Sequence, residues 1–180
     1  MELSPGTRKE ALRLARWALE WHLRGNRVPP PDLTDPVFEE PHGLFVTIHR
    51  DDELRGCVGR VDPLTVLREE IPDLALAAAT RDPRFYPVTP QEVETVRIEI
   101  SLLTPPEEVR DVSEIQVGTH GIIVERNGAK GLLLPQVAVE EGWDRNTFLA
   151  HACLKAAQPP EAWKDPETRI YRFTAEVFSE

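Results

Sequence analysis

The dipeptide Asn127-Gly128 is the feature that most restricts how this 180-residue chain can fold. A type I′ turn needs positive φ at both of its central positions, and Asn-Gly is the pair that adopts this geometry most readily. Counting outward from the turn places Glu125 opposite Lys130, and their opposite charges support that register. The sequence therefore predicts an antiparallel ribbon around this turn, with His120 close to its open end.

Helix and strand signals are mixed along the rest of the chain. A serine followed by a proline is typical of a helix start, and we expect a helix from about Pro5 to Arg24 that ends at Gly25. Residues 96–102 alternate apolar and polar side chains, which predicts a strand with one buried face. Further expected elements are strands at 43–49, 53–58 and 170–178, a helix that begins at Asp62-Pro63 and is kinked or split at Pro72, a short turn of helix opened by the capping box 89–92, and helices at 135–142 and 144–157. This mixture predicts helices together with a largely antiparallel sheet.

The segment 54–59, Leu-Arg-Gly-Cys-Val-Gly, is the least ordinary part of the chain. Glycine inside a strand marks a bulge, or a place where another backbone or a ligand comes close, and both Gly56 and Gly59 are candidates for such contact. The thiol of Cys57 between them is either packed or presented to solvent. If it is presented, the neighbouring cation of Arg55 favours the thiolate.

The face of the sheet on which Cys57 lies depends on the length of the preceding loop. A two-residue loop places the thiol on the same face as Val46 and Ile48. A three-residue loop places it instead with Thr47 and His49. The sequence leaves both registers open.

The composition excludes several classes of protein. A net charge of -10 argues against strong non-specific binding of nucleic acid, which needs a basic surface. Cys57 and Cys153 are too few for a disulfide framework and lack the spacing of a metal site, so we expect reduced thiols and no bound metal. The chain has no apolar run of about eighteen residues and no signal-peptide pattern. We therefore expect a cytoplasmic protein without a membrane partner.

The segment 81–87, Arg-Asp-Pro-Arg-Phe-Tyr-Pro, predicts a polar and aromatic loop. Asp82 stands between two arginines, of which Arg84 is the second. Such a group can bind an anion, but a structural ion pair between arginine and aspartate is the commoner arrangement. Both interpretations stay open at this point.

Segments spread over about residues 10 to 178 form one recognisable pattern: Gly43–Thr47, Leu54–Gly59, Asp82–Pro87, Ile98–Leu103, Gly118–Gly121, Leu134–Ala138 and Trp143-Asp144. In this order they resemble the AMMECR family, named for the Alport, midface-hypoplasia and elliptocytosis chromosomal-region protein. The departures are small. Val58 replaces the usual isoleucine, Arg60 replaces a small or polar residue, and Ala157 stands where the helix often ends in glycine.

The resemblance implies one AMMECR-type α+β domain over residues 1–180. It implies a larger lobe built from both chain termini, a smaller lobe within about 112–160, and a cleft between them lined by the family segments. Prokaryotic relatives are associated with, or fused to, Memo-like and radical-SAM proteins, which makes such proteins expected partners. The family has no firmly established reaction, so the cofactor stays unknown and it stays open whether the chain is an enzyme.

Two functions fit these residues. We expect the chain to bind a small or anionic ligand, or a partner segment, in the cleft, through Arg55, Gly56, Gly59, Asp82, Arg84 and His120. The alternative is a thiol-dependent enzyme linked to Memo-like or radical-SAM pathways, with Cys57 as the nucleophile or redox thiol, Arg55 as its electrostatic partner and His120 as the acid or base. A purely structural interpretation has the Gly-Cys-Gly segment make room where a helix crosses the strand.

Overall fold

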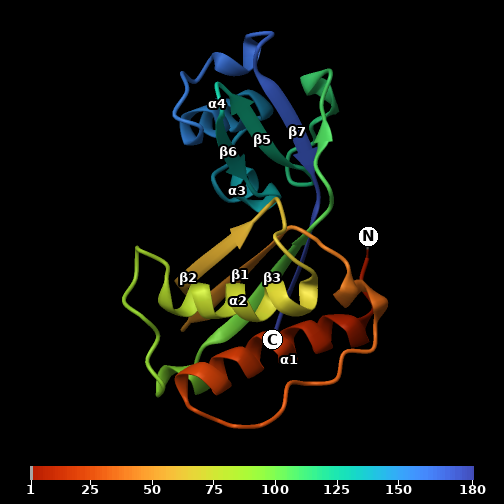
Figure 1. Ribbon diagram of the computed structural model, residues 1–180. Coiled ribbons are helices and arrows are strands. Elements are labelled where there is room, and N and C mark those ends of the chain that lie inside the picture. The colour runs from red at the N-terminus through yellow and green to blue at the C-terminus, as the bar shows by residue number, and fades with distance from the viewer. Residues whose placement is uncertain (1) are drawn as a thin grey trace. The chain divides into compact units, whose positions relative to one another are not determined.

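The computed structural model describes residues 2–180, which form two compact units (Figure 1). The first unit contains the residues up to Leu103 together with Glu176–Glu180, and the second contains Thr104–Ala175. Each unit has its own four-stranded sheet and its own hydrophobic core. The α+β class and the larger lobe built from both chain ends are thereby confirmed, and the predicted range 112–160 lies inside the second unit.

The first unit is a sheet of strand order β2-β1-β3-β8 with two long helices on one face (Figure 1). Its elements are α1 (Pro5–Leu23), a 3₁₀ turn (Pro36–Glu39), β1 (Leu44–Arg50), β2 (Glu53–Arg60), α2 (Leu67–Thr80), a 3₁₀ turn (Glu92–Glu94), β3 (Arg97–Leu103) and β8 (Ala175–Ser179). The predicted start of α1 is confirmed, because the Ser4 side chain accepts a hydrogen bond from the Thr7 N–H at 3.1 Å. Gly25 follows the end of the helix with a φ of 69°.

The core of the first unit lies between this sheet and the two helices. Val46 and Ile48 of β1 are fully buried there, as is Ile98 of β3. Removing a side chain of this size from water contributes roughly 1.5–3 kcal/mol. The alanines of α2, including Ala75 and Ala78, are also buried, so that the helix lies close to β1 and β2.

The second unit is a sheet of strand order β4-β7-β5-β6 covered by helix α4. Its elements are β4 (Glu107–Glu108), a 3₁₀ turn (Val112–Glu114), β5 (Gly121–Arg126), β6 (Ala129–Leu133), α3 (Pro135–Glu140), α4 (Arg145–Lys155), a 3₁₀ turn (Ala162–Lys164) and β7 (Arg169–Phe173). Asn127 and Gly128 have φ values of 53° and 78°, and Glu125 pairs with Lys130. The predicted hairpin and its register are confirmed.

Two predicted elements differ from the structure. The helix expected from Asp62-Pro63 begins only at Leu67, whose N–H donates to the Glu40 carbonyl at 3.0 Å, and it continues through Pro72 without being divided. The single strand expected at 170–178 is two strands, β7 and β8, which belong to different sheets. They separate at Thr174, which the periodicity of the side chains did not reveal.

Candidate functional site

The turn between β1 and β2 has two residues, Asp51 and Asp52, with φ values of 52° and 62°. A β-bulge then follows in β2, because Arg55 is an extra residue between the cross-strand pairs formed by Leu54 and Gly56. An extra residue moves every later side chain of the strand to the opposite face of the sheet. The bulge, which neither predicted register included, therefore decides where the thiol lies.

Cys57 lies opposite Thr47, on the face of the sheet that does not carry the helices. Val46 and Ile48 alternate with Thr47 and point into the core. The loop has two residues, but because of the bulge Cys57 lies on the face that a three-residue loop predicts.

Both glycines of this segment are required by the chain's own packing. A Cβ atom added to Gly56 would lie 2.1 Å from the carbonyl oxygen of Ala78 in α2. A Cβ atom added to Gly59 would lie 2.3 Å from the ring of Phe45. Such distances are far inside van der Waals contact, so these contacts account for the glycines without a ligand. Their assignment as ligand contacts stays a prediction.

The thiol of Cys57 is half-buried, and Thr47 Oγ1 donates a hydrogen bond to its Sγ at 3.3 Å. Burial raises the pKa of the Cys57 thiol, and the carboxylates of Asp82 and Glu99 act in the same direction. The hydroxyl of Thr47 and the guanidinium of Arg84 oppose this shift without reversing it. The thiol is therefore protonated at neutral pH, which does not favour a nucleophilic role.

Asp82 joins the loop after α2 to β2, which is an edge strand. Its Oδ2 accepts a hydrogen bond from the Cys57 N–H at 2.9 Å and another from Arg84 Nη2 at 2.7 Å. Its Oδ1 accepts from Arg84 Nε at 3.0 Å, which completes a two-point ion pair. The Arg84 bonds hold the pKa of the buried Asp82 carboxyl far below its usual range. Of the two interpretations that the sequence left open, the structural ion pair is therefore present in this loop, between Asp82 and Arg84.

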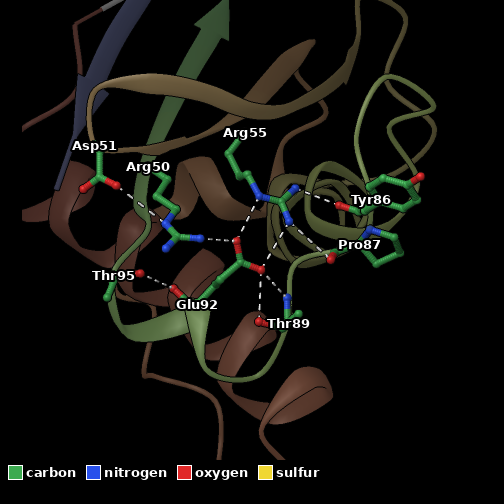
Figure 2. Close-up of polar contacts among 8 residues, drawn as sticks. All are labelled: Arg50, Asp51, Arg55, Tyr86, Pro87, Thr89, Glu92 and Thr95. Atoms are coloured by element: carbon green, nitrogen blue, oxygen red, sulfur yellow. Dashed lines mark hydrogen bonds and ion pairs between the residues drawn. The ribbon is translucent and has the colours of Figure 1, made fainter.

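A second ion pair joins Arg55 to Glu92 (Figure 2). Arg55 Nε and Nη2 donate to the two carboxylate oxygens of Glu92 at 3.1 and 3.2 Å, and Nη1 and Nη2 donate to the carbonyls of Tyr86 and Pro87 at 2.7 and 3.3 Å. Arg50 Nη1 adds a bond to Glu92 at 2.9 Å. Arg55 therefore fixes the loop after α2 at a second point.

Glu92, which binds both Arg50 and Arg55, was not identified as a site residue from the sequence. The capping box predicts its contact with Thr89, and the Thr89 N–H does donate to Glu92 Oε2 at 2.8 Å. The hydrogen bonds from Arg55, followed by that from Thr89, lower the pKa of Glu92 to about 2. Arg55 is 37 residues away along the chain, so no local pattern indicates this contact.

A pocket of about 640 Å³ lies against this loop and is lined by Arg55, Pro83, Arg84, Phe85 and Tyr86. None of these described lining residues is acidic, although the chain has a net charge of -10. The Arg84 guanidinium lies 5.5 Å from the centre of the Phe85 ring, and Tyr86 is 90% exposed. The pocket therefore offers arginine hydrogen-bond donors next to aromatic surface.

The other predicted site residue, His120, belongs to the second unit. Its Nδ1 accepts a hydrogen bond from the Gln116 N–H at 3.0 Å, and burial lowers the pKa of the imidazole. Arg81 pairs with Asp73 at 2.7 Å and does not line the pocket. The convergence of His120 with Cys57, and the cleft between the lobes, stay predictions.

The described residues also carry two negative findings. Within residues 2–180, no three or more histidine, cysteine, aspartate or glutamate side chains are grouped so that they could hold a metal ion. No helix in this part of the chain has the length and apolarity needed to cross a membrane.

Comparison with known proteins identifies the family. The model of the AMMECR1 family matches residues 12–178. The chain belongs to the AMMECR1 family. An AMMECR1 relative from Methanothermobacter thermautotrophicus is 47% identical over 191 residues, which cover 100% of this chain and 99% of the relative. A relative from Thermococcus gammatolerans is 47% identical over 180 residues, which cover 94% of this chain and 88% of the relative.

The AMMECR1 fold described above is also found in a crystal structure. The uncharacterised protein PH0010 from Pyrococcus horikoshii is similar with a TM-score of 0.90 and 41% sequence identity, over 100% of this chain and 94% of that one. The names of these three relatives state no activity, ligand or partner.

Proposed function

We propose that this AMMECR1 protein binds a ligand, or a segment of a partner, through an anionic group that enters the pocket beside Arg84. One observation carries the proposal. Asp82 holds Nε and Nη2 of the Arg84 guanidinium, whereas Nη1 has no hydrogen-bond partner among residues 2–180. The side chain of Arg84 is 56% exposed, so the remaining donors are accessible. An arginine already held by a carboxylate loses little further freedom when it binds a ligand.

Arg55 has a different role in this proposal. Its side chain is only 18% exposed and is hydrogen-bonded to Glu92 and to two carbonyls of the loop. We therefore assign it the positioning of Tyr86, whose carbonyl it binds, and assign the direct contact with the anion to Arg84.

The walls of the pocket indicate what the anionic group is attached to. Phe85 and Tyr86 provide aromatic surface, which favours an apolar or aromatic body next to the charge. The volume falls within the range of about 300–1,000 Å³ that is usual for ligand pockets. Segments of Memo-like and radical-SAM proteins that combine an acidic and an aromatic residue are the partners to test first.

The structure gives less support to the thiol-dependent enzyme. Burial raises the pKa of Cys57, and its N–H is the group that binds Asp82. Cys57 then contributes its backbone to the site while its thiol hydrogen-bonds with Thr47. This arrangement fits a binding module better than nucleophilic chemistry.

Calorimetric titration with phenyl phosphate tests the proposal, with neutral phenol as the reference compound. We expect phenyl phosphate to bind more tightly than phenol, and Arg84→Gln to weaken its binding about tenfold because a charge-assisted hydrogen bond is lost. Tyr86→Ala should also weaken it, since the aromatic wall is removed. The matched control is Arg81→Gln, which removes an exposed arginine outside the pocket. Equal losses in Arg81→Gln and Arg84→Gln, or none in Arg84→Gln, would contradict the proposal.

A further inference from the structure

A second hollow adjoins the proposed pocket. Its volume is about 280 Å³, and it is lined by Arg50, Asp51, Glu53, Leu54 and Arg55. Arg55 is thus a wall of both hollows. Figure 2 shows its guanidinium between Arg50 on one side and Tyr86 on the other. The two hollows are therefore neighbours on the surface of the first unit, separated by one fixed side chain.

The two hollows differ in the charged groups that they expose. The second one includes the exposed carboxylates of Asp51 and Glu53, and the side chain of Asp51 is 91% exposed. Its two arginines, Arg50 and Arg55, are already bound to Glu92 at 2.9 and 3.1 Å, and Arg50 lies 3.7 Å from Asp51. The larger hollow, by contrast, has Arg84 and no acidic residue among its described lining. Together they complement one anionic group and one cationic group.

We infer that the occupant of the two hollows is an extended peptide segment with an acidic side chain beside Arg84 and a basic side chain beside Asp51 and Glu53. This inference rests on the proposed function and names its partner class. Alternate side chains of an extended segment project from one face about 7 Å apart, so neighbouring hollows can take residues i and i+2. Leu54 and Tyr86, which are 41% and 90% exposed, give the rest of the segment apolar contact.

Side chains, rather than strand pairing, hold the segment next to Cys57. The N–H of Cys57 is already bound to Asp82, and its carbonyl accepts from Arg84 Nη2 at 3.5 Å. An edge strand whose main chain is occupied in this way does not offer these groups to an added strand. Charge complementarity therefore determines which segment binds.

The test uses two blocked peptides, Gly-Glu-Gly-Lys-Gly and Gly-Glu-Gly-Glu-Gly, titrated into the full chain and followed by amide NMR shifts. Wild type should prefer the mixed peptide. Glu53→Lys should weaken the mixed peptide about three- to tenfold and strengthen the acidic peptide, because the charge of the second hollow is reversed. Glu53 is exposed, so this variant should fold normally. The matched control is Glu141→Lys, which makes the same charge change at an exposed residue of the second unit.

Titration with phenyl phosphate distinguishes a failure of this inference from a failure of the proposed function. Phenyl phosphate should bind Glu53→Lys and wild type alike to within about twofold, since residue 53 is outside the larger hollow. If phenyl phosphate binds but wild type does not prefer the mixed peptide, the peptide inference is overturned and the proposed function stands. If Glu141→Lys changes peptide binding as much as Glu53→Lys, the effect is one of net charge, and the inference is likewise overturned. If phenyl phosphate fails to bind wild type, both fail.

Discussion

Asp82 and Cys57 are joined by a hydrogen bond of 2.9 Å from the backbone N–H of the cysteine to the carboxylate of the aspartate. The same carboxylate holds Arg84 at two points. One buried acid therefore fixes the loop to the edge of β2 and also orients the guanidinium beside the pocket. The cysteine takes part in this arrangement through its main chain.

Removing this acid should destabilise the first unit. Asp82→Ala leaves the Cys57 N–H and the Arg84 guanidinium without their partner, and we expect the free energy of unfolding to fall by about 2–3 kcal/mol. Urea denaturation followed by tryptophan fluorescence measures the change. The matched control is Asp73→Ala, which removes a half-exposed partner of Arg81 and should cost less than about 1 kcal/mol. Equal effects would show that Asp82 is no more than a surface acid.

The contribution of Glu92 should depend on pH in a defined direction. Its pKa falls from 4.5 to about 2 in the folded chain, so the carboxylate stabilises the fold above the unfolded value and loses this effect as the pH falls through the folded value. Since each pKa unit corresponds to about 1.4 kcal/mol, this fall in the pKa predicts that Glu92→Gln costs about 3 kcal/mol at neutral pH. Urea denaturation at a series of pH values should show this difference shrinking from about pH 4.5 towards pH 2. A difference that stays constant through this window would contradict the assignment.

Gly56 should tolerate no side chain. In Gly56→Ala the new methyl group meets the Ala78 carbonyl, a backbone atom that cannot rotate away, and we expect a loss of about 2–4 kcal/mol or failure to fold. Gly6→Ala is the matched control, because its Cβ atom would lie 3.6 Å from Ser4 Oγ and its position is in the first turn of α1. The measurement is the melting temperature of each variant by thermal unfolding. A normal melting temperature for Gly56→Ala would show that α2 does not lie on β2 in this way.

The thiol of Cys57 should react slowly at neutral pH. Because burial raises its pKa, the midpoint of the alkylation rate with iodoacetamide against pH should lie above the ordinary thiol value of about 8.5. The measurement uses the Cys153→Ser background, so that Cys57 is the remaining thiol. Fast alkylation at pH 7, with a midpoint below the ordinary value, would favour the thiol-dependent enzyme over the binding function.

Much of the fold was predictable because its signals are local. The Asn127-Gly128 turn fixes its own φ values and the pairing of the strands beside it, and the alternation in β3 marks its buried face. Ser4 and Gly25 likewise mark the two ends of α1 within a few residues of the groups that they cap. In each case the residues that determine the structure are close neighbours in sequence.

The candidate site was less predictable because its contacts are distant in sequence. The bulge at Arg55 changes the face of Cys57. The neighbouring Gly56 indicates either a bulge or a close approach, but it does not say which of the two occurs or which residue is the extra one. Glu92 looks like a helix cap, and its bond to Arg55 forms only when the chain has folded. The resemblance to the family indicated which segments to examine, while the structure shows which side chains within them meet.

A crystal structure of the chain with phenyl phosphate tests the central claim most directly. We predict that the phosphate oxygens lie within hydrogen-bond distance of Arg84 Nη1, with the phenyl ring against Phe85 or Tyr86 and the Asp82–Arg84 ion pair intact. Phenyl phosphate bound elsewhere while this pocket holds only water, or a phosphate that displaces Asp82 from Arg84, would contradict the account.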